Sequence, residues 1–274
     1  MFNGTQNFLL TILTKKYSPL LLNQQKKLKN KIVRLAKILS RSGFCSRREA
    51  EKLIDQGKIF VNGLVYKNHL ISIDNINKIR INNRSITIPR TRVWCFNKSV
   101  GLICSNSNQY GKKRIFDVLP EYLPRVVSIG RLDLNSEGLL LLTNDAQFST
   151  FLESPKNKIV RKYMVTVQGD VKKLNINALK KGIEVEGITY KSIDLKIIKE
   201  NRNHILEFTL IEGKNREIRK ICSFYKLKIK QLKRIQFGPF KINKLKLNNV
   251  LEINKIILKK KLKELGFKSE NYFR

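Results

Sequence analysis

The sequence has few of the residues that build metal, disulfide or nucleotide sites. Its 274 residues include only four cysteines, none in C-x-x-C spacing, and two isolated histidines. This pattern predicts neither a local zinc site nor a disulfide framework, and reduced thiols are typical of a cytoplasm-like compartment. The chain also lacks the glycine pattern of a Walker-type or dinucleotide-binding loop. We therefore expect no metal and no cofactor.

Acidic residues are scarce as well. The 21 Asp and Glu residues stand against 56 Lys and Arg, which leaves a formal net charge of +35. Since no apolar run would carry the chain into a membrane, a polyanion is the expected partner. A biased genome composition accounts for part of the excess, because Lys far outnumbers Arg and is spread along the whole chain. The arginines are more selective and gather in residues 34–48, 80–92 and 202–234.

Residues 1–31 form a basic leader without any acidic residue. Transit peptides are acid-poor and basic, but this segment has no Arg and is poor in Ser. Two interpretations remain open: a disordered leader on a bacterial cytoplasmic protein, or a transit peptide that would direct the chain to an organelle matrix.

The pattern from residue 32 to residue 90 predicts a small α/β module. A helical pattern starts at Ile32 and breaks at Gly43, and Ser46 followed by Glu49 forms a capping box that opens a second helix. Residues 58–65 then form a hairpin around an Asn-Gly turn. Basic side chains recur along the module and are candidate phosphate contacts. They are Arg34, Lys37, Arg41, Arg47, Arg48 and Lys58.

Several short runs in this module resemble the S4-like RNA-binding domain. They are Arg34-Leu35-Ala36-Lys37, Ser42-Gly43, Ser46-Arg47-Arg48-Glu49-Ala50-Glu51, Ile54, Gly57-Lys58 and Val61-Asn62-Gly63. The resemblance implies that the module anchors the protein on RNA. For each arginine alone, a solvated helix face is the competing interpretation.

The rest of the chain predicts a larger α+β domain on a mainly antiparallel sheet, over residues 91–253. Strands are expected at 93–98, 162–168 and 204–211, and helices at 172–180 and 216–224. Residues 254–274 form a basic tail, in which 255–263 predict a helix that is solvated or touches RNA.

One carboxylate in this domain is a candidate catalytic group. Asp133 stands in Gly130-Arg131-Leu132-Asp133, ahead of the apolar run Leu139–Leu142. A nearby cation keeps a carboxylate ionised and apolar neighbours keep it dry, as a nucleophile or base requires. A plain loop aspartate paired with Arg131 is the alternative on the local pattern alone.

Two further segments complete a resemblance to the pseudouridine synthases that modify ribosomal RNA, over residues 92 to 253. They are Arg161-Lys162-Tyr163 and Glu212-Gly213-Lys214-Asn215-Arg216-Glu217-Ile218-Arg219-Lys220. The resemblance makes Asp133 the catalytic aspartate, Tyr163 the ring that stacks on the target base and Arg219 the cation that pairs with Asp133. It places Ile218 beside the base, with Lys214, Arg216 and Arg131 as further substrate contacts.

This resemblance implies an isomerase that needs no cofactor and acts in ribosome biogenesis as a monomer. The Asn-Arg-Glu-Ile-Arg segment is closer to the B-type enzymes that act on the large ribosomal subunit, which implies large-subunit ribosomal RNA as substrate. Departures from the family pattern are Ser136 in place of Thr, Ala146 in place of Gly and Ser99 in place of Pro. Attack by Asp133 on the ring and a route through a glycal both remain open, as do a non-catalytic assembly factor and a substrate in small-subunit or transfer RNA.

Overall fold

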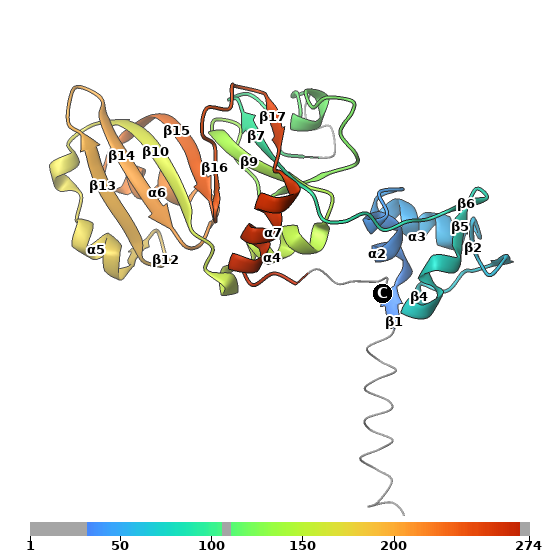
Figure 1. Ribbon diagram of the computed structural model, residues 1–274. Coiled ribbons are helices and arrows are strands. Elements are labelled where there is room, and N and C mark those ends of the chain that lie inside the picture. Colours follow the sequence, from blue (N-terminus) through green and yellow to red (C-terminus); the bar gives the residue numbers. More distant parts are fainter. Residues whose placement is uncertain (1–31, 106–110, 269–274) are drawn as a thin grey trace, which may run out of the picture. The chain divides into compact units, whose positions relative to one another are not determined.

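The computed structural model describes residues 32–105 and 111–268, which form two compact units that meet in sequence at Pro89 and Arg90. The predicted leader, residues 1–31, lies outside the described residues. Figure 1 shows the elements of both units.

The first unit contains two helices and short strands around an apolar core that includes Leu35, Ile38, Ile54 and Ile79. Its elements are β1 (Ile32–Arg34), α2 (Leu35–Arg41), α3 (Arg47–Asp55), β2 (Ile59–Val61), β3 (Leu64–Val65), β4 (Leu70–Ser72), η1 (Ile73–Lys78), β5 (Ile79–Ile81) and β6 (Arg84–Ser85). Strands β3, β2, β5 and β6 form one antiparallel sheet, and β1 pairs with β4.

Two local predictions in this unit are confirmed. The Ser46 side chain accepts a hydrogen bond from the Glu49 N–H, and the Glu49 carboxylate accepts one from the Ser46 N–H, which is the predicted capping box at the start of α3. Asn62 and Gly63 have φ of 54° and 81°, as the tight turn between β2 and β3 requires.

The start of the first helix differs from the sequence-based expectation. Residues 32–34 form strand β1, which pairs with β4, and helix α2 begins only at Leu35. The apolar spacing from Ile32 fits a helix, but the ladder to a strand some forty residues away outweighs this local preference.

The second unit is built on a nine-stranded sheet in the order β13-β14-β10-β15-β9-β7-β17, with β16 paired to β15 and β8 paired to β9. Its strands are β7 (Val93–Lys98), β8 (Val127–Ile129), β9 (Glu137–Thr143), β10 (Arg161–Gln168), β13 (Ile193–Lys199), β14 (His204–Leu210), β15 (Lys228–Phe237), β16 (Phe240–Lys241) and β17 (Val250–Glu252). Strands β9 and β15 pair in parallel, and the other neighbouring strands of this sheet pair antiparallel. The predicted α+β class with a mainly antiparallel sheet is confirmed.

Helices and a small hairpin accompany this sheet. They are α4 (Ala146–Glu153), α5 (Ile176–Lys181), α6 (Glu217–Phe224), α7 (Lys255–Glu264) and the pair β11 (Ile183–Val185) with β12 (Ile188–Tyr190), and the short 3-10 turns are η2 (Ile115–Asp117), η3 (Pro155–Asn157) and η4 (Val171–Lys173). Instead of one helix at 172–180, the chain forms η4 and then α5, because Asn175 caps a new helix through the Ala178 N–H.

Strand β9 is buried on both faces. Leu139 and Leu141 face one apolar cluster with Phe148 of α4, and Leu140 and Leu142 face another with Trp94 and Phe96 of β7. The run of four leucines therefore forms a central strand, and the residues just before it are held by the core on both sides.

The C-terminal helix differs from the expectation of a solvated appendage. Leu258 of α7 is 5% exposed and belongs to the cluster that contains Phe148 of α4, and Leu262 and Leu265 pack against the same cluster. In Figure 1, α7 lies beside α4. The compact second unit therefore extends past the predicted boundary at residue 253, because an apolar edge remains on this lysine-rich helix.

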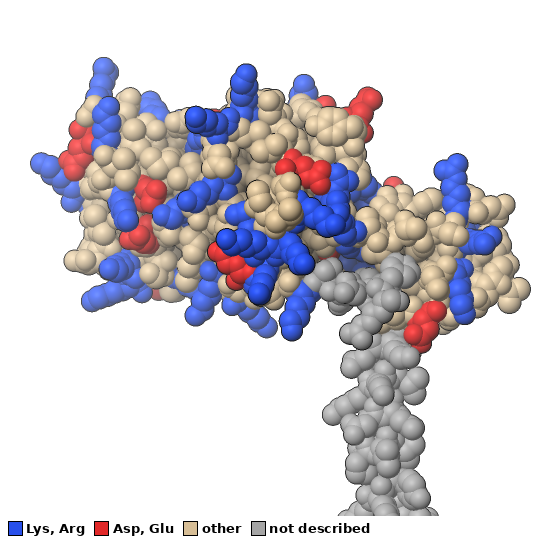
Figure 2. Space-filling model, in the orientation of Figure 1, with Lys and Arg blue, Asp and Glu red and all other residues tan. Residues whose placement is uncertain are grey.

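Lysine and arginine side chains project over much of the visible surface of both units, with few acidic residues among them (Figure 2). Within residues 32–105 and 111–268, no helix is long and apolar enough to span a bilayer.

Candidate active site

A cleft of about 680 Å³ opens in the second unit. It lies near the parallel pair of β9 and β15, which joins the β17-β7-β9 half of the sheet to the β15-β10-β14-β13 half. The loop between β8 and β9, strands β10 and β15 and the segment that leads into α6 line it. It contains all the residues for which the sequence predicts a role in catalysis or substrate binding: Asp133, Tyr163, Arg219, Arg131, Ile218, Lys214 and Arg216.

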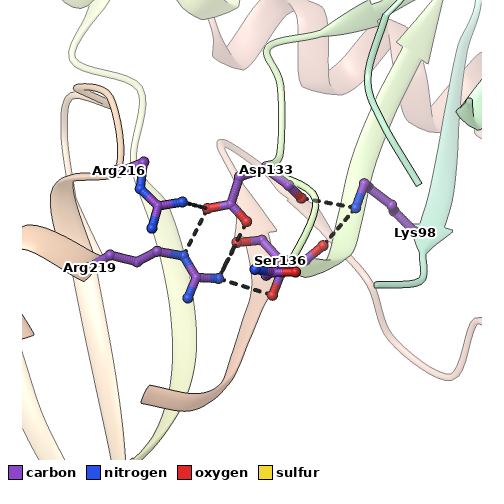
Figure 3. Close-up of polar contacts among 6 residues, drawn as sticks. Lys98, Asp133, Ser136, Arg216 and Arg219 are labelled. Carbon is purple, nitrogen blue, oxygen red and sulfur yellow. Dashed lines mark hydrogen bonds and ion pairs between the residues drawn. The ribbon is translucent and has the colours of Figure 1, made fainter. Parts of the chain in front are cut away.

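Asp133 and Arg219, which are 86 residues apart, form a two-point ion pair in this cleft. Arg219 Nε donates to Asp133 Oδ2 at 2.9 Å, and Nη2 donates to Oδ1 at 3.3 Å (Figure 3). The same Nη2 also donates to the Asn135 carbonyl and to the Ser136 hydroxyl. Arg216 adds a second cation, with Nη1 3.7 Å from Asp133 Oδ2. The carboxylate is therefore fixed in direction by Arg219 and faces a positive field.

Opposing effects act on the pKa of Asp133. Burial raises it, but the hydrogen bonds from Arg219 and Ser136, with the charges of Arg219 and Arg216, outweigh burial and hold the pKa below its usual range. The carboxylate is thus ionised at neutral pH. Ser136 keeps the hydroxyl of the threonine that the family pattern has there, and this structure uses that hydroxyl.

Lys98 holds the backbone of the Asp133 loop from inside the core. This lysine ends strand β7 and is fully buried. Its Nζ donates to the carbonyls of Asp133 at 3.1 Å, Ser136 at 2.8 Å and Ser99 at 3.0 Å. Desolvation lowers the pKa of Lys98. All three donors of the ammonium are used, so the turn that presents Asp133 depends on this side chain.

Replacing Lys98 with Met should destabilise the second unit by about 3–5 kcal/mol, because a similar volume is kept but three carbonyls lose their donor. Urea unfolding followed by tryptophan fluorescence measures the change in the free energy of unfolding. The signal comes from Trp94, the one tryptophan of the chain, which lies on β7 with Lys98. Lys241→Met on the exposed part of β16 is the control and should leave the unfolding midpoint unchanged. Equal midpoints for Lys98→Met and the wild type would contradict this role.

Gly138 brings the Asp133 loop against β15. It has φ of +99°, and a Cβ placed there would lie 2.3 Å from the Arg234 carbonyl oxygen. No other residue fits this parallel contact without moving one of the strands. The close approach joins the halves of the sheet and sets Asp133 near the residues of β10 and β15.

Tyr163 lies on the floor of the cleft among buried charges. Tyr163 of β10 pairs in register with Arg234 of β15, and Arg161 pairs with Phe237, so these four side chains share one face of the sheet. The centroid of the Phe237 ring lies 4.7 Å from Cζ of Arg161 and 5.0 Å from Cζ of Arg234. A register shift in the β10–β15 ladder lies next to Tyr163, and such irregularities re-aim side chains.

The other predicted substrate contacts differ in their exposure and in whether they already have partners within the protein. Ile218 is 4% exposed and faces the cleft from α6. Arg131 is exposed at the rim, and Asp133 pairs with Arg219 and Arg216 instead. The Lys214 ammonium contacts the Thr189 carbonyl and lies 3.7 Å from the Glu212 carboxylate, so it is already engaged within the protein.

Glu217 is a buried acid for which the sequence predicts no role. It is 3% exposed and lines the cleft, and its Oε2 accepts a hydrogen bond from the Lys214 N–H at 2.9 Å. Burial raises the pKa of this carboxyl to about 7; the nearby charge of Glu212 adds to the rise, while the hydrogen bond from Lys214 and the charges of Lys214 and Arg161 oppose it.

This shift predicts a stability that depends on pH. The folded protein holds the Glu217 proton more tightly than the unfolded chain, so its contribution is complete below the ordinary pKa of 4.5 and is lost as pH rises to about 7. Relative to Glu217→Gln, the wild type should lose on the order of 3 kcal/mol over this interval. Urea unfolding of both proteins between pH 4 and pH 8 measures the difference. A difference that stays constant with pH would contradict the shift.

The predicted RNA contacts of the first unit fall into two groups. Arg34, Arg47, Arg48 and Lys58 are exposed, and Lys37 is half-buried. Arg41, in contrast, is 8% exposed and offers RNA little contact area, because it lies at the end of α2 on the buried side of the helix.

The sequence predicts no individual function for Lys98, at the end of β7, or for the cleft residues Arg161, Glu217 and Arg234. A lysine inside an otherwise apolar strand is a signal for Lys98, whereas no local pattern singles out Arg234. Over the described residues, no three His, Cys, Asp or Glu side chains gather in a way that could hold a metal ion. Ser99, which follows Lys98, stands where the family pattern has a proline. Its backbone N–H donates to Asn248 Oδ1, and a proline has no N–H for this bond.

Comparison with known proteins connects this geometry to a family. Residues 92–224 match the RNA pseudouridylate synthase family, and residues 33–69 match the S4 domain. A solved pseudouridylate synthase shares 25% identity and a TM-score of 0.60, covering 84% of this chain and 99% of that one.

Curated bacterial relatives match over most of their length. An uncharacterized RNA pseudouridine synthase of Rickettsia typhi is 43% identical over 83% of this chain and 94% of its own. The ribosomal large subunit pseudouridine synthase B of Buchnera aphidicola is 35% identical over 86% of this chain and 96% of its own. These matches confirm the predicted isomerase class and the S4-like module. The chain therefore belongs to the RNA pseudouridine synthase family, with an S4 domain ahead of the synthase domain.

Proposed function

We propose that this enzyme isomerises one specific uridine of large-subunit ribosomal RNA to pseudouridine, with Asp133 as the catalytic aspartate. The observation that carries the proposal is the ion pair of Asp133 with Arg219 in the cleft that also contains Tyr163. The 35% identity to a large-subunit synthase of type B supports the choice of RNA. A bacterial cytoplasmic location accords with these bacterial relatives, and the enzyme is proposed to act as a monomer.

The reaction moves the bond between ribose and uracil from nitrogen to carbon five. It requires a carboxylate at the sugar or the base, either to attack covalently or to take a proton from the ribose. Asp133 is suited to both, because its lowered pKa leaves it ionised and Arg219 fixes its direction. The protein thus supplies geometry and electrostatic support.

Tyr163 and Ile218 provide the place for the base. The target uridine has to leave its stack before a carboxylate can reach it, which costs a few kcal/mol. Stacking of one base on an aromatic ring returns about 1–3 kcal/mol. Tyr163 faces the cleft from the sheet and Ile218 faces it from α6, so a flipped base can be held between apolar surfaces beside Asp133.

The S4 domain is proposed to anchor the enzyme through phosphate contacts of exposed basic residues. Arg47→Gln, Arg48→Gln and Lys58→Gln together should weaken RNA binding and lower the slope of log affinity against log salt by about 2–3, since each lost contact removes roughly 0.7–0.9. Filter binding at several salt concentrations measures the slope. Lys78→Gln in the same unit is the control, because it removes a single exposed charge and should change the slope by less than about 1. An unchanged slope in the triple variant would mean that these residues are solvated surface.

Mapping pseudouridine in ribosomal and transfer RNA from cells with and without the gene tests the proposal. One missing site in large-subunit RNA, restored by the wild-type gene and not by Asp133→Asn, is the expected result. A missing site in small-subunit or transfer RNA would overturn the choice of substrate. No missing site at all would favour a non-catalytic assembly factor.

A further inference from the structure

Asp133 has two arginines beside it in the cleft. Arg216 and Arg219 approach the same carboxylate oxygen, Oδ2, with Arg216 Nη1 at 3.7 Å and Arg219 Nε at 2.9 Å (Figure 3). One carboxylate balances only one of the two guanidinium charges, so a surplus positive charge remains at this point of the cleft. Because RNA carries one negative charge for each phosphate, this surplus suits the expected substrate.

The two arginines differ in how fully the protein already uses them. Arg219 is 15% exposed and donates to Asp133 through two nitrogens, as well as to the Asn135 carbonyl and the Ser136 hydroxyl. The Arg216 side chain is 53% exposed, and its 3.7 Å contact with Asp133 is too long for a hydrogen bond. Arg216 can therefore offer hydrogen-bond donors to a ligand while Arg219 holds the carboxylate.

The other basic residues of the cleft are less suited to this place. Three of them are buried or already bound within the protein: Arg161, Arg234 and Lys214. Arg131 is exposed, but it lies at the rim, and Asp133 is paired with Arg216 and Arg219 instead. Arg216 is thus the exposed cation that stands next to the carboxylate.

The backbone of Arg216 has a conformation that favours glycine. Its φ is 53°, in the left-handed region, at the residue just before α6. Of the described residues that line the cleft, it is the one non-glycine residue with a positive φ. Glycine would adopt this conformation without the steric cost that a side chain adds. Backbone strain of this kind clusters at ligand sites, where the side chain is what the position supplies.

We infer that Arg216 binds a phosphate group beside the target ribose, between that phosphate and Asp133. In the proposed reaction Asp133 acts at the ribose or the base of the target nucleotide, and a phosphate is joined to each side of that ribose. The substrate therefore brings negative charge towards a negative carboxylate, and a guanidinium between the two offsets their repulsion. Guanidinium donors also form strong, directional hydrogen bonds to phosphate oxygens.

This inference rests on the proposed function and gives Arg216 the role of a residue that binds and orients the target nucleotide. Arg216→Gln should lower the single-turnover rate on an RNA fragment with the target uridine by about 10–10²-fold, at enzyme concentrations below saturation, because hydrogen bonds to a charged group are lost. Arg216→Lys should recover part of the rate, since it keeps the charge without the two-point geometry. A wild-type rate for Arg216→Gln would overturn the inference.

The pH and salt dependence of the rate on this RNA separates phosphate binding from an effect on Asp133 alone. The loss in Arg216→Gln should persist at pH 8, where Asp133 is ionised with or without the second arginine. The slope of log rate against log salt should fall by roughly 0.7–0.9, as expected for one lost phosphate contact. A loss that disappears at pH 8, or an unchanged slope, would overturn the inference.

RNA that lacks one phosphate tests the contact itself. The target uridine is placed in a two-strand RNA that is nicked on its 5′ or its 3′ side, with or without a phosphate at the nick. With the phosphate present, Arg216→Gln should remain about 10–10²-fold slower than the wild type. Without it on one of the two sides, the two proteins should agree within about threefold. The same loss on all four RNAs would overturn the inference.

Two further variants control for the fold and for loss of an arginine elsewhere. Arg216→Gly relieves the left-handed backbone, so it should lose rate as Arg216→Gln does while its unfolding midpoint in urea stays at or above that of the wild type. A loss of rate that follows a fall in the midpoints of both variants would make the role structural and overturn the inference. Arg202→Gln, an exposed change between β13 and β14, should leave the ratio of rates with and without the nick phosphate unchanged.

The outcomes also distinguish this inference from the proposed function. A wild type that converts no RNA overturns both. A wild type that converts uridine, with an Arg216→Gln protein that shows the same phosphate dependence as the wild type, overturns the inference alone.

Discussion

Asp133→Asn should lower the single-turnover rate of pseudouridine formation by at least about 10³-fold. The amide keeps the shape of the side chain but can neither attack the ribose or base nor take a proton, and such roles are worth about 10²–10⁴-fold or more. RNA affinity should stay within a few-fold, because phosphate contacts elsewhere dominate binding. Rapid-quench assays and filter binding on the same RNA measure the two quantities.

A matched change on the surface controls for loss of an acidic residue. Asp170 is exposed and caps a short 3-10 turn through the Lys172 N–H. Asp170→Asn removes a charge and keeps a capping side chain, so rate and affinity should both match the wild type. Conversion by Asp133→Asn at a rate near that of Asp170→Asn would remove Asp133 from the mechanism.

Arg219→Ala should reduce the rate by about 10²–10³-fold, because Asp133 loses the two hydrogen bonds from Arg219 that fix its direction. The pKa of Asp133 should also rise, since burial raises it and the main opposing contact is gone. In the wild type, loss of activity in acid should occur below 3.8, the ordinary pKa of the group. In Arg219→Ala this loss should begin at a higher pH, and the pH dependence of the single-turnover rate shows both effects.

Two variants distinguish charge from geometry at this position. Arg219→Lys keeps a cation but cannot make the two-point contact, so it should recover only part of the lost rate. Lys220→Ala, the next residue of α6, removes an ion pair to Glu186 at 3.8 Å outside the cleft and should behave as the wild type. A pH profile for Arg219→Ala that overlays that of the wild type would contradict the electrostatic role.

The sequence carries much of this site in short segments. Asp133 precedes an apolar run that forms the buried strand β9, and the capping box at Ser46 marks the start of α3, so both could be predicted from local pattern. The pairing of Asp133 with Arg219 follows from the family resemblance, since nothing in either segment alone specifies the other.

The remaining features depend on contacts between distant segments. Arg234 is an ordinary basic residue in a polar stretch until the register of β15 places it beside Tyr163. Strand β1 has an apolar spacing that suits a helix, and only its partner β4 makes it a strand. The apolar edge of α7 consists of a few residues, such as Leu258 and Leu262, between lysines. Its burial depends on the apolar cluster that includes Phe148 of α4.

The most direct measurement is position-resolved pseudouridine mapping of large-subunit ribosomal RNA from cells that lack the gene, after incubation with the purified wild type or with Asp133→Asn. The wild type should introduce pseudouridine at one position, in a yield that approaches one per RNA molecule, and Asp133→Asn should introduce none. Two results would contradict the assignment of this cleft as the site of uridine isomerisation. One is pseudouridine formed by the Asp133→Asn protein, and the other is no pseudouridine formed by a folded wild type that binds the RNA.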